Sequence, residues 1–302
     1  MNITLRQLEV FVAVARCGSV SLAASKLYLS QPAASMAVAE LEKILGDKFF
    51  DRKGRKLHLN EKGRALLPIS IDILNRVDEV ERHFSHESLQ PTGIFKLGAS
   101  TTIGSYVLPK LLDLFIKKFP KTEVSLDVQN SDAIIEKILS FDIDMGIIEG
   151  QCNNPAIETI PWRKDRLAVF CSPEHPLAKK EAISERDLSE AKWILRESGS
   201  GSRAIFENAA TGIINNFNVL LELGNTEAVK NAVESNIGIS CLSIYTLERS
   251  IKHNELVELK TPFLDLSRFY YILVHKKKYK NQVLQSCLDF WKRHSSIDKE
   301  DE

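Results

Sequence analysis

Three stretches of small polar residues offer the side chains best suited to holding an anion. Each follows an apolar, strand-like stretch and precedes a helical pattern. They are Ser100, Thr101 and Thr102; then Glu197, Ser198, Gly199, Ser200, Gly201 and Ser202; then Asn225 and Thr226. Helix N-termini expose unpaired N–H groups and a positive dipole end, and Arg196 and Arg203 add positive charge. One such stretch alone would indicate a cap or a turn, but three together predict a small-anion site.

A carboxylate is expected beside that anion. Glu149 ends the apolar stretch 143–149 and is predicted to face the same site. A bare carboxylate repels an anion, so Glu149 fits best if the ligand carries a proton that it can donate to the carboxylate. This hypothesis favours a protonated oxyanion and expects its affinity to change between about pH 6 and 9.

A second kind of chemistry is indicated near the N-terminus, in a helix predicted to begin after Ser30. The Ser30 hydroxyl can cap this helix, and Pro32 fits its first turn, where a missing N–H costs nothing. The apolar positions form one stripe: Ala34, Ala37, Val38, Leu41, Ile44 and Leu45. The residues outside the stripe are Gln31, Ser35, Met36 and Ala39. Small side chains permit close approach to a partner, and Gln31 can hydrogen-bond a base edge in the major groove of DNA.

Positive charge gathers directly after this helix. Two stretches whose side chains alternate between two faces, as in a β-strand, flank Lys53 and Gly54. They predict a β-hairpin wing that carries Arg52, Lys53, Arg55 and Lys56. Residues 1–60 hold nine basic and five acidic side chains, a net charge of +4, in a chain with 40 of each. Beside a helix-turn-helix, this cluster favours contact with DNA phosphates over a solvated loop.

Residues 5–64 resemble the winged helix-turn-helix of LysR-type transcriptional regulators. The resemblance rests on Ala-Ala at 23–24, Ser-Gln-Pro-Ala at 30–33, Leu-Glu at 41–42 and Phe-x-Arg at 50–52. Two positions depart from it: Ala34 replaces a larger aliphatic residue, and Met36 stands where many members carry arginine or another polar residue. The resemblance implies that promoter DNA is contacted by Ser21, Ser30, Gln31, Pro32, Ser35, Met36, Arg52, Lys53, Arg55 and Lys56.

A long helix is predicted next, from a cap at Asn60 to about residue 86, with a kink at Pro68. Its apolar residues, spaced by three or four, are Leu66, Ile69, Ile73, Val77, Val80 and Phe84. Such a narrow stripe is typical of a coiled-coil seam, with packing against the chain's own core as the alternative. In LysR-type regulators the equivalent helix pairs two protomers. The resemblance therefore implies a homodimer that assembles into a homotetramer, and RNA polymerase is a further candidate partner.

Strand-like and helix-like stretches alternate from residue 93 onward, which predicts an α/β fold. A new strand is expected to begin at residue 166, after Pro161. This part resembles the two-lobed, periplasmic-binding-protein-like (type 2) effector domain of LysR-type regulators. We therefore expect a DNA-binding domain at 1–60, a linker helix at 61–90 and an effector-binding domain at 91–302. One lobe of this domain is expected to comprise about 91–163 and 266–302, and the other about 164–265. Ligands are expected to bind beyond the carboxyl ends of the strands.

Residues 193–203 and 221–243 resemble the YeiE-type subgroup of the family, which is associated with sulfite sensing. The subgroup is close to the regulators of carbon-fixation operons and of sulfur assimilation. The resemblance implies a transcription regulator whose promoter contacts change when a small anionic effector, with a sulfite-like oxyanion favoured, binds between the lobes. A larger organic or sulfur-metabolite effector is the alternative within this class.

The remaining features argue against other classes of protein. The sequence has no G-x-S-x-G, H-E-x-x-H or P-loop motif and no clustered metal ligands, so we expect neither an enzyme nor a metal or cofactor. The N-terminus does not resemble a signal peptide, and no apolar run reaches the roughly 18 residues of a membrane span. We therefore expect a cytoplasmic protein without membrane contact and disfavour a solute-binding protein. Five cysteines without a C-x-x-C pair are expected to be reduced, with a redox switch as the less favoured alternative.

Overall fold

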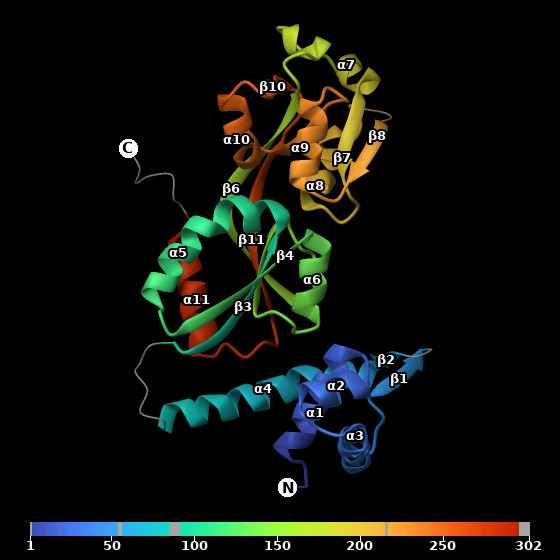
Figure 1. Cartoon of the computed structure of the whole chain (residues 1–302), viewed down its shortest axis with the longest axis vertical. Coiled ribbons are helices and arrows are strands. Elements are labelled where there is room, and N and C mark those ends of the chain that lie inside the picture. The colour runs from blue at the N-terminus through green and yellow to red at the C-terminus, as the bar shows by residue number, and fades with distance from the viewer. Residues whose placement is uncertain (1, 54–55, 85–90, 215–216, 296–302) are drawn as a thin grey trace. The chain divides into compact units, whose positions relative to one another are not determined.

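The computed structural model describes residues 2–53, 56–84, 91–214 and 217–295 (Figure 1). The chain divides into two compact units. The first comprises Met1–Gln90 with the short segments Ser140–Asp142 and Lys277–Gln285, and the second comprises the rest of the chain. Each unit has a hydrophobic core of its own.

The first unit begins with three short helices, α1 (Leu5–Cys17), α2 (Val20–Lys26) and α3 (Gln31–Leu45). Each starts at a polar cap, because the side chains of Thr4, Ser19 and Ser30 accept backbone N–H groups of the first turns. Gly18 and Gly46 end α1 and α3 in the left-handed conformation, which glycine adopts without strain. Local capping therefore sets the boundaries of the helix-turn-helix.

The apolar stripe of α3 is shorter than the sequence predicted. Ala34, Val38 and Leu41 are buried, whereas Ile44 and Leu45 are 36% and 39% exposed. Both exposed residues lie in the last turn of α3, beyond the last buried position. The prediction that they belong to the core was therefore wrong for this unit.

A hairpin and a long helix complete the first unit. The strands β1 (Phe50–Lys53) and β2 (Lys56–Leu59) pair antiparallel. The helix α4 (Glu61–Phe84) follows, and Asn60 Oδ1 accepts the N–H of Gly63 at 2.9 Å, as expected of a cap. The helix continues through Pro68 as one element of 24 residues.

Two apolar faces run along α4. Leu67 and Ile71 are buried in the core of the first unit. Ile69, Ile73 and Val80 are 56%, 38% and 57% exposed on the face predicted to form a seam. Leu66 and Val77 of the same set are half-buried, and the side chain of Phe84 lies outside the described residues. Leu66 packs against the core of the first unit, so both alternatives hold in part: the start of the predicted seam contacts the chain's own core, while Ile69, Ile73 and Val80 remain exposed.

The second unit is built on a mixed sheet with the strand order β10-β6-β11-β5-β3-β4, in which β9 also pairs with β6. The strands are β3 (Gly93–Ser100), β4 (Thr122–Gln129), β5 (Met145–Glu149), β6 (Ile157–Cys171), β9 (Ser240–Ser243), β10 (Val257–Leu259) and β11 (Ser267–His275). Because β3 runs parallel to β4 and β5, the carboxyl ends of these strands meet at one edge. Strand β6 links the first half of the unit, around β3–β5, to the second half, around β9 and β10.

The sequence predicted a new strand at residue 166, but β6 is one strand of 15 residues through Pro161. Its register against β11 shifts here, since Tyr270 pairs with Arg163 and Tyr271 pairs with Pro161. Trp162 therefore has no opposite residue. Proline has no N–H to donate to a neighbouring strand, and a β-bulge is a place where that loss is tolerated.

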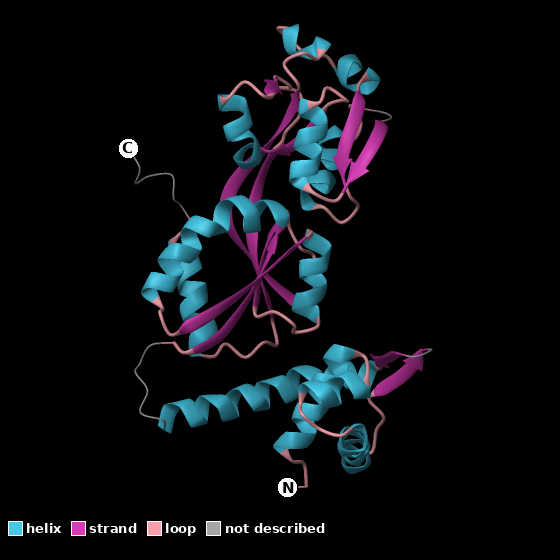
Figure 2. Ribbon diagram, in the orientation of Figure 1, coloured by secondary structure: helices cyan, strands magenta, loops and turns pink. Residues whose placement is uncertain are grey.

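Helices cover both faces of the first half. Figure 2 shows α5 (Leu108–Lys118) and α11 (Gln282–Arg293) on one side of the strands and α6 (Ser131–Leu139) on the other. A π-helical turn, Ile103–Val107, joins β3 to α5. Aromatic rings fill the space beneath α5, with centroids 5.9 Å apart for Phe95 and Phe115 and 6.1 Å apart for Phe115 and Trp291.

The second half adds a parallel pair of strands, β7 (Lys192–Arg196) and β8 (Asn218–Leu223). The helices α8 (Gly201–Ala210) and α9 (Thr226–Glu234) were expected from the sequence, whereas α7 (Glu185–Glu190), α10 (Ile244–Lys252) and β10 were not. Trp193 and Phe206 form the centre of this half, with ring centroids 4.7 Å apart.

None of the described helices is long and apolar enough to cross a membrane.

Candidate functional site

The outward face of α3 includes the residues that the sequence placed there, Gln31, Ser35, Met36 and Ala39, together with other exposed positions. The Ser30 hydroxyl accepts the N–H of Ala33 at 3.3 Å and so fixes the first turn. Gln31, Pro32, Ser35 and Met36 are all exposed, as is Ser21 on α2. The face is therefore available to a partner molecule.

The wing presents cations beside this face. Arg52 on β1 and Lys56 on β2 are exposed. The register pairs Lys53 with Lys56 across the hairpin, an arrangement of like charges that a nearby anion would stabilise. Arg55 and the side chain of Lys53 lie outside the described residues.

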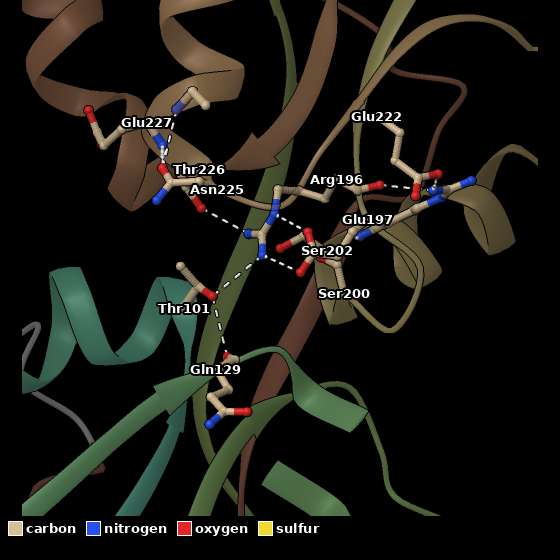
Figure 3. A network of polar contacts seen from close by, with 12 residues as sticks. Thr101, Gln129, Arg196, Glu197, Ser200, Ser202, Glu222, Asn225, Thr226 and Glu227 are labelled. Atoms are coloured by element: carbon tan, nitrogen blue, oxygen red, sulfur yellow. Dashed lines mark hydrogen bonds and ion pairs between the residues drawn. The ribbon is translucent and has the colours of Figure 1, made fainter. Parts of the chain in front are cut away.

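Arg196 is the centre of a contact between the two halves of the second unit (Figure 3). It ends β7, is 4% exposed, and forms a two-pronged ion pair with Glu197, at 2.7 Å from Nε and 2.9 Å from Nη2. Its Nη1 donates to Thr226 Oγ1 at 2.9 Å and its Nη2 to Thr101 Oγ1 at 3.4 Å. We call Thr101, Arg196, Glu197 and Thr226 the polar junction.

The charge of Arg196 determines the protonation of its partner. Burial alone would raise the pKa of Glu197, but the hydrogen bonds and the charge of Arg196 outweigh burial and hold that pKa below its ordinary value. Glu197 is thus ionised at neutral pH, and the charge of Arg196 is balanced within the chain. The sequence also predicted that Arg203 adds positive charge to the site. That charge is balanced within the chain as well, because Arg203 donates to Glu207 at 2.8 Å and to Glu222.

A second, deeper cluster surrounds Arg268 on β11, which the sequence analysis did not single out. Its side chain is 2% exposed, Nε donates to Asp165 Oδ2 at 2.6 Å, and Nη1 donates to Ser202 Oγ at 3.0 Å. Asp165, on β6, is fully buried and also accepts from Ser243 at 3.0 Å. Burial would lower the pKa of Arg268, but the charges of Glu149 and Asp165 raise it. We call Arg268, Asp165, Ser202 and Glu149 the buried arginine cluster.

Glu149 lies at the end of β5, as the sequence predicted, and is 5% exposed. Its Oε2 accepts the Ser131 hydroxyl at 3.0 Å. Gly201, the first residue of α8, lies so close that an added Cβ would be 2.7 Å from Ser131 Oγ and 3.0 Å from Glu149 Cβ. A glycine at position 201 thus lets the N-terminus of α8 pack closely against Ser131 and the end of β5 at Glu149.

Two buried polar atoms in this region have no hydrogen-bond partner. They are Ser100 Oγ, at the end of β3, and Arg268 Nη2. Buried polar atoms are satisfied in the great majority of cases. Thr102 is buried in the same segment, at 1% exposed. The end of β3 and the start of β11 therefore present a hydroxyl and a donor whose bonding capacity the chain leaves unused.

Several other predicted site residues serve as helix caps. Ser200 Oγ accepts the N–H of Arg203 at 3.5 Å, and Asn225 Oδ1 accepts the N–H groups of Glu227 and Ala228 at 2.8 and 3.2 Å. Gly199 adopts the left-handed conformation, with φ of +84°, and Ser198 is exposed. The N–H groups expected to hold an anion at these helix ends are thus partly used by the chain itself.

Three of the five cysteines, Cys171, Cys241 and Cys287, are buried, whereas Cys17 and Cys152 are half-buried. All five are free thiols. Burial raises the pKa of Cys171 to about 11, and it also raises the pKa values of Cys241 and Cys287. A protonated thiol is a poor nucleophile, so these three buried residues are expected to be inert.

A surface cavity of about 400 Å³ lies elsewhere in the second half. It is lined by His175, Pro176, Leu177, Asp187, Glu190, Ala191, Lys192, Asn236, Ile237 and Gly238. It contains none of the predicted site residues. Burial lowers the pKa of His175 at its edge, which keeps that imidazole neutral at physiological pH.

Two known domain families match the chain. Residues 5–64 match the bacterial regulatory helix-turn-helix proteins of the lysR family, and residues 88–296 match the LysR substrate binding domain. The order of the two domains is the one predicted from the sequence.

Relatives match over nearly the whole length. The HTH-type transcriptional regulator YeiE of Escherichia coli is 39% identical over 290 residues, covering 96% of this chain and 97% of the relative. The HTH-type transcriptional activator CmpR of Synechocystis is 33% identical over 293 residues, covering 97% and 96%.

Solved structures show the same architecture. A full-length OxyR variant from Pseudomonas aeruginosa superposes with a TM-score of 0.75 at 19% identity, covering 98% of this chain and 96% of that one. The regulatory domain of Synechocystis CcmR in complex with 2-PG superposes with a TM-score of 0.64 at 31% identity, covering 68% of this chain and 99% of that one. The predicted fold class is thereby confirmed.

Proposed function

Because the chain belongs to the LysR family of DNA-binding transcription regulators, we propose that its promoter contacts are controlled by a small oxyanion, with sulfite favoured, bound at the buried arginine cluster. It is a regulator and not an enzyme. The observation that carries the proposal is the pair of unpartnered atoms, Ser100 Oγ and Arg268 Nη2. A buried donor without an acceptor costs free energy, and a bound oxyanion would recover that cost.

The polar junction supplies the conformational response. Arg268 Nη2 is sealed from solvent, so an anion reaches it only when the two halves separate. The bond from Arg196 to Thr101 joins the halves in the absence of ligand, while the bond from Arg196 to Thr226 holds the guanidinium in place within the second half. A ligand that binds the separated arrangement better shifts the equilibrium by no more than its differential affinity for the two arrangements.

Glu149 favours an oxyanion that carries a proton. Its Oε2 already accepts from Ser131, so a ligand O–H would donate to Oε1. A fully ionised anion would instead repel this carboxylate at close range. A second candidate effector is 2-PG, because the CcmR regulatory domain, 31% identical to this chain, was solved in complex with it.

The first unit supplies the DNA contacts in this proposal. Gln31, Ser35 and Met36 on α3 face base edges, while Ser21, Ser30, Pro32, Arg52, Lys53, Arg55 and Lys56 lie near phosphates. The seam of α4, with Ile69, Ile73 and Val80 exposed, pairs two protomers, and pairs of dimers form a homotetramer. A cytoplasmic location and contact with RNA polymerase follow from this role.

Thermal stabilisation of the full-length protein tests the effector site. We expect sulfite at 100 times its dissociation constant to stabilise the protein by about 2.7 kcal/mol. This stabilisation by sulfite should be lost in Ser100→Ala and in Arg268→Lys. The lysine keeps the positive charge of Arg268 but not its forked donor geometry. Ser235→Ala, at an exposed serine outside the predicted site, should keep the stabilisation.

Other results of this experiment would contradict different parts of the proposal. Equal stabilisation of all variants by sulfite would place the anion away from Ser100 and Arg268. Stabilisation by 2-PG alone would favour the second candidate. Sulfate and phosphate serve as oxyanion controls, and a response to all anions alike would indicate a general ionic effect.

A further inference from the structure

The exposed face of α3 carries one long apolar side chain near its centre. Met36 is 69% exposed. Successive helical residues turn by about 100°, so Met36 lies roughly opposite the buried Ala34 and Val38. Towards the N-terminus of α3, its neighbours on this face, Pro32 and Ser35, are exposed and shorter, whereas Glu40, one turn towards the C-terminus, is exposed and of similar length. Met36 therefore projects further towards a partner than the residues on its N-terminal side.

The thioether of Met36 has the wrong chemistry for most groups on DNA. It carries no charge to attract a phosphate and no donor to bind a base edge. The apolar group that the major groove presents is the C5 methyl of thymine. A flexible, polarisable thioether packs well against such a methyl group.

We propose that Met36 reads the C5 methyl group of a thymine, so that each half-site of the bound DNA contains a thymine at that position. Gln31, at the N-terminus of the same helix, reads a different base by hydrogen bonds. The inference rests on the proposed contact of α3 with DNA. It adds the chemical group that Met36 recognises and therefore a feature of the DNA sequence.

Two other apolar side chains of this helix-turn-helix are strongly exposed, Leu22 at 60% and Tyr28 at 97%. Leu22 belongs to α2, and Tyr28 to the turn before α3. Single exposed apolar residues are ordinary on protein surfaces. Leu22 thus provides a matched control, since its truncation removes an exposed apolar side chain outside α3.

The test begins with selection of preferred sites from random double-stranded DNA by the full-length protein. Each thymine of the selected site is then replaced by deoxyuridine, which differs only in lacking the C5 methyl. We expect binding to weaken about fourfold at one thymine per half-site, the fold-change for burying one methyl-sized group. Met36→Ala should bind the thymine and deoxyuridine sites equally, whereas Leu22→Ala should keep the fourfold ratio.

The possible results separate this inference from the function on which it rests. Because Met36 is exposed, Met36→Ala should melt at the temperature of the unmodified protein. A selected site that is insensitive to every replacement, or a Met36→Ala variant that keeps the sensitivity, would overturn the inference and leave the DNA contact intact. Failure to select any sequence would overturn the proposed DNA contact and the inference together.

Discussion

At Gly201 the backbone of α8 approaches two side chains so closely that a hydrogen atom is the largest substituent that fits. The neighbours are Ser131 Oγ and Glu149 Cβ. Both belong to elements of the first half of the second unit, while α8 belongs to the second half. The absence of a side chain at this residue therefore lets the two halves meet around Glu149.

Replacing Gly201 by alanine should destabilise the second unit. The added Cβ would lie 2.7 Å from Ser131 Oγ, and overpacking of this kind costs about 1–3 kcal/mol. Urea unfolding followed by tryptophan fluorescence is a suitable measurement, because Trp162, Trp193 and Trp291 all lie in the second unit. Gly224→Ala is the control, since nothing lies within 4 Å of its added Cβ. Equal unfolding midpoints for the two variants would refute the close contact.

At the scale of elements, one buried guanidinium joins the end of β7 to the start of α9 and to the segment after β3. Arg196 makes these contacts through Thr226 and Thr101 while Glu197 balances its charge. Breaking the pair leaves an uncompensated charge on a side chain that is 3% exposed. The ion pair therefore affects both the stability of the second unit and the contact between its halves.

The Glu197 pair should make stability depend on pH in the acid range. The pKa of Glu197 is lowered in the folded state, so its stabilising contribution is complete above the unfolded pKa of about 4.3 and is lost as pH falls through the folded value. Glu197→Gln should therefore be less stable than the unmodified protein at pH 7, and the difference should shrink below about pH 4. Urea midpoints at several pH values measure this difference. A difference that stays constant over the whole range would count against the ionic role of Glu197.

At the scale of the whole molecule, the two apolar faces of α4 differ in what covers them. Leu67 and Ile71 attach the helix to its own unit, whereas Ile69 and Val80 remain exposed. Large apolar side chains repeated along one exposed helix face mark an interaction surface. In the proposed dimer a second copy of the same helix covers this surface, and pairing would place two DNA-reading faces on one assembly.

Charge on this face should separate the protomers. In Ile69→Glu combined with Val80→Glu, like charges would meet across the proposed seam, so we expect sedimentation equilibrium to show dissociation at concentrations where the unmodified protein is a dimer or larger. DNA binding should weaken in parallel, because two linked half-sites bind more tightly than separate ones. Asp78→Asn, on another side of α4, should leave both properties unchanged. A double variant that remains associated would place the interface elsewhere.

Local signals in the sequence determined most of the described helices, though not α7 and α10, and the outward face of α3. Ser30 and Asn60 cap helices as expected, because a cap requires only its own side chain and the next few N–H groups. The alternation of strands and helices predicted an α/β fold for the same reason. The strand ends that carry Ser100, Glu149 and Arg196 were likewise located from the sequence.

Only the tertiary structure decided which of these residues meet and what lies beneath them. Arg268 and Asp165 are 103 positions apart, and Arg196 and Thr101 are 95 apart, so no local pattern predicts either contact. The continuation of β6 through Pro161 depends on a bulge opposite β11, a feature of the pairing rather than of either strand. The sequence also could not predict that Arg268 Nη2 has no hydrogen-bond partner. The burial and bonding of a side chain depend on every element that surrounds it.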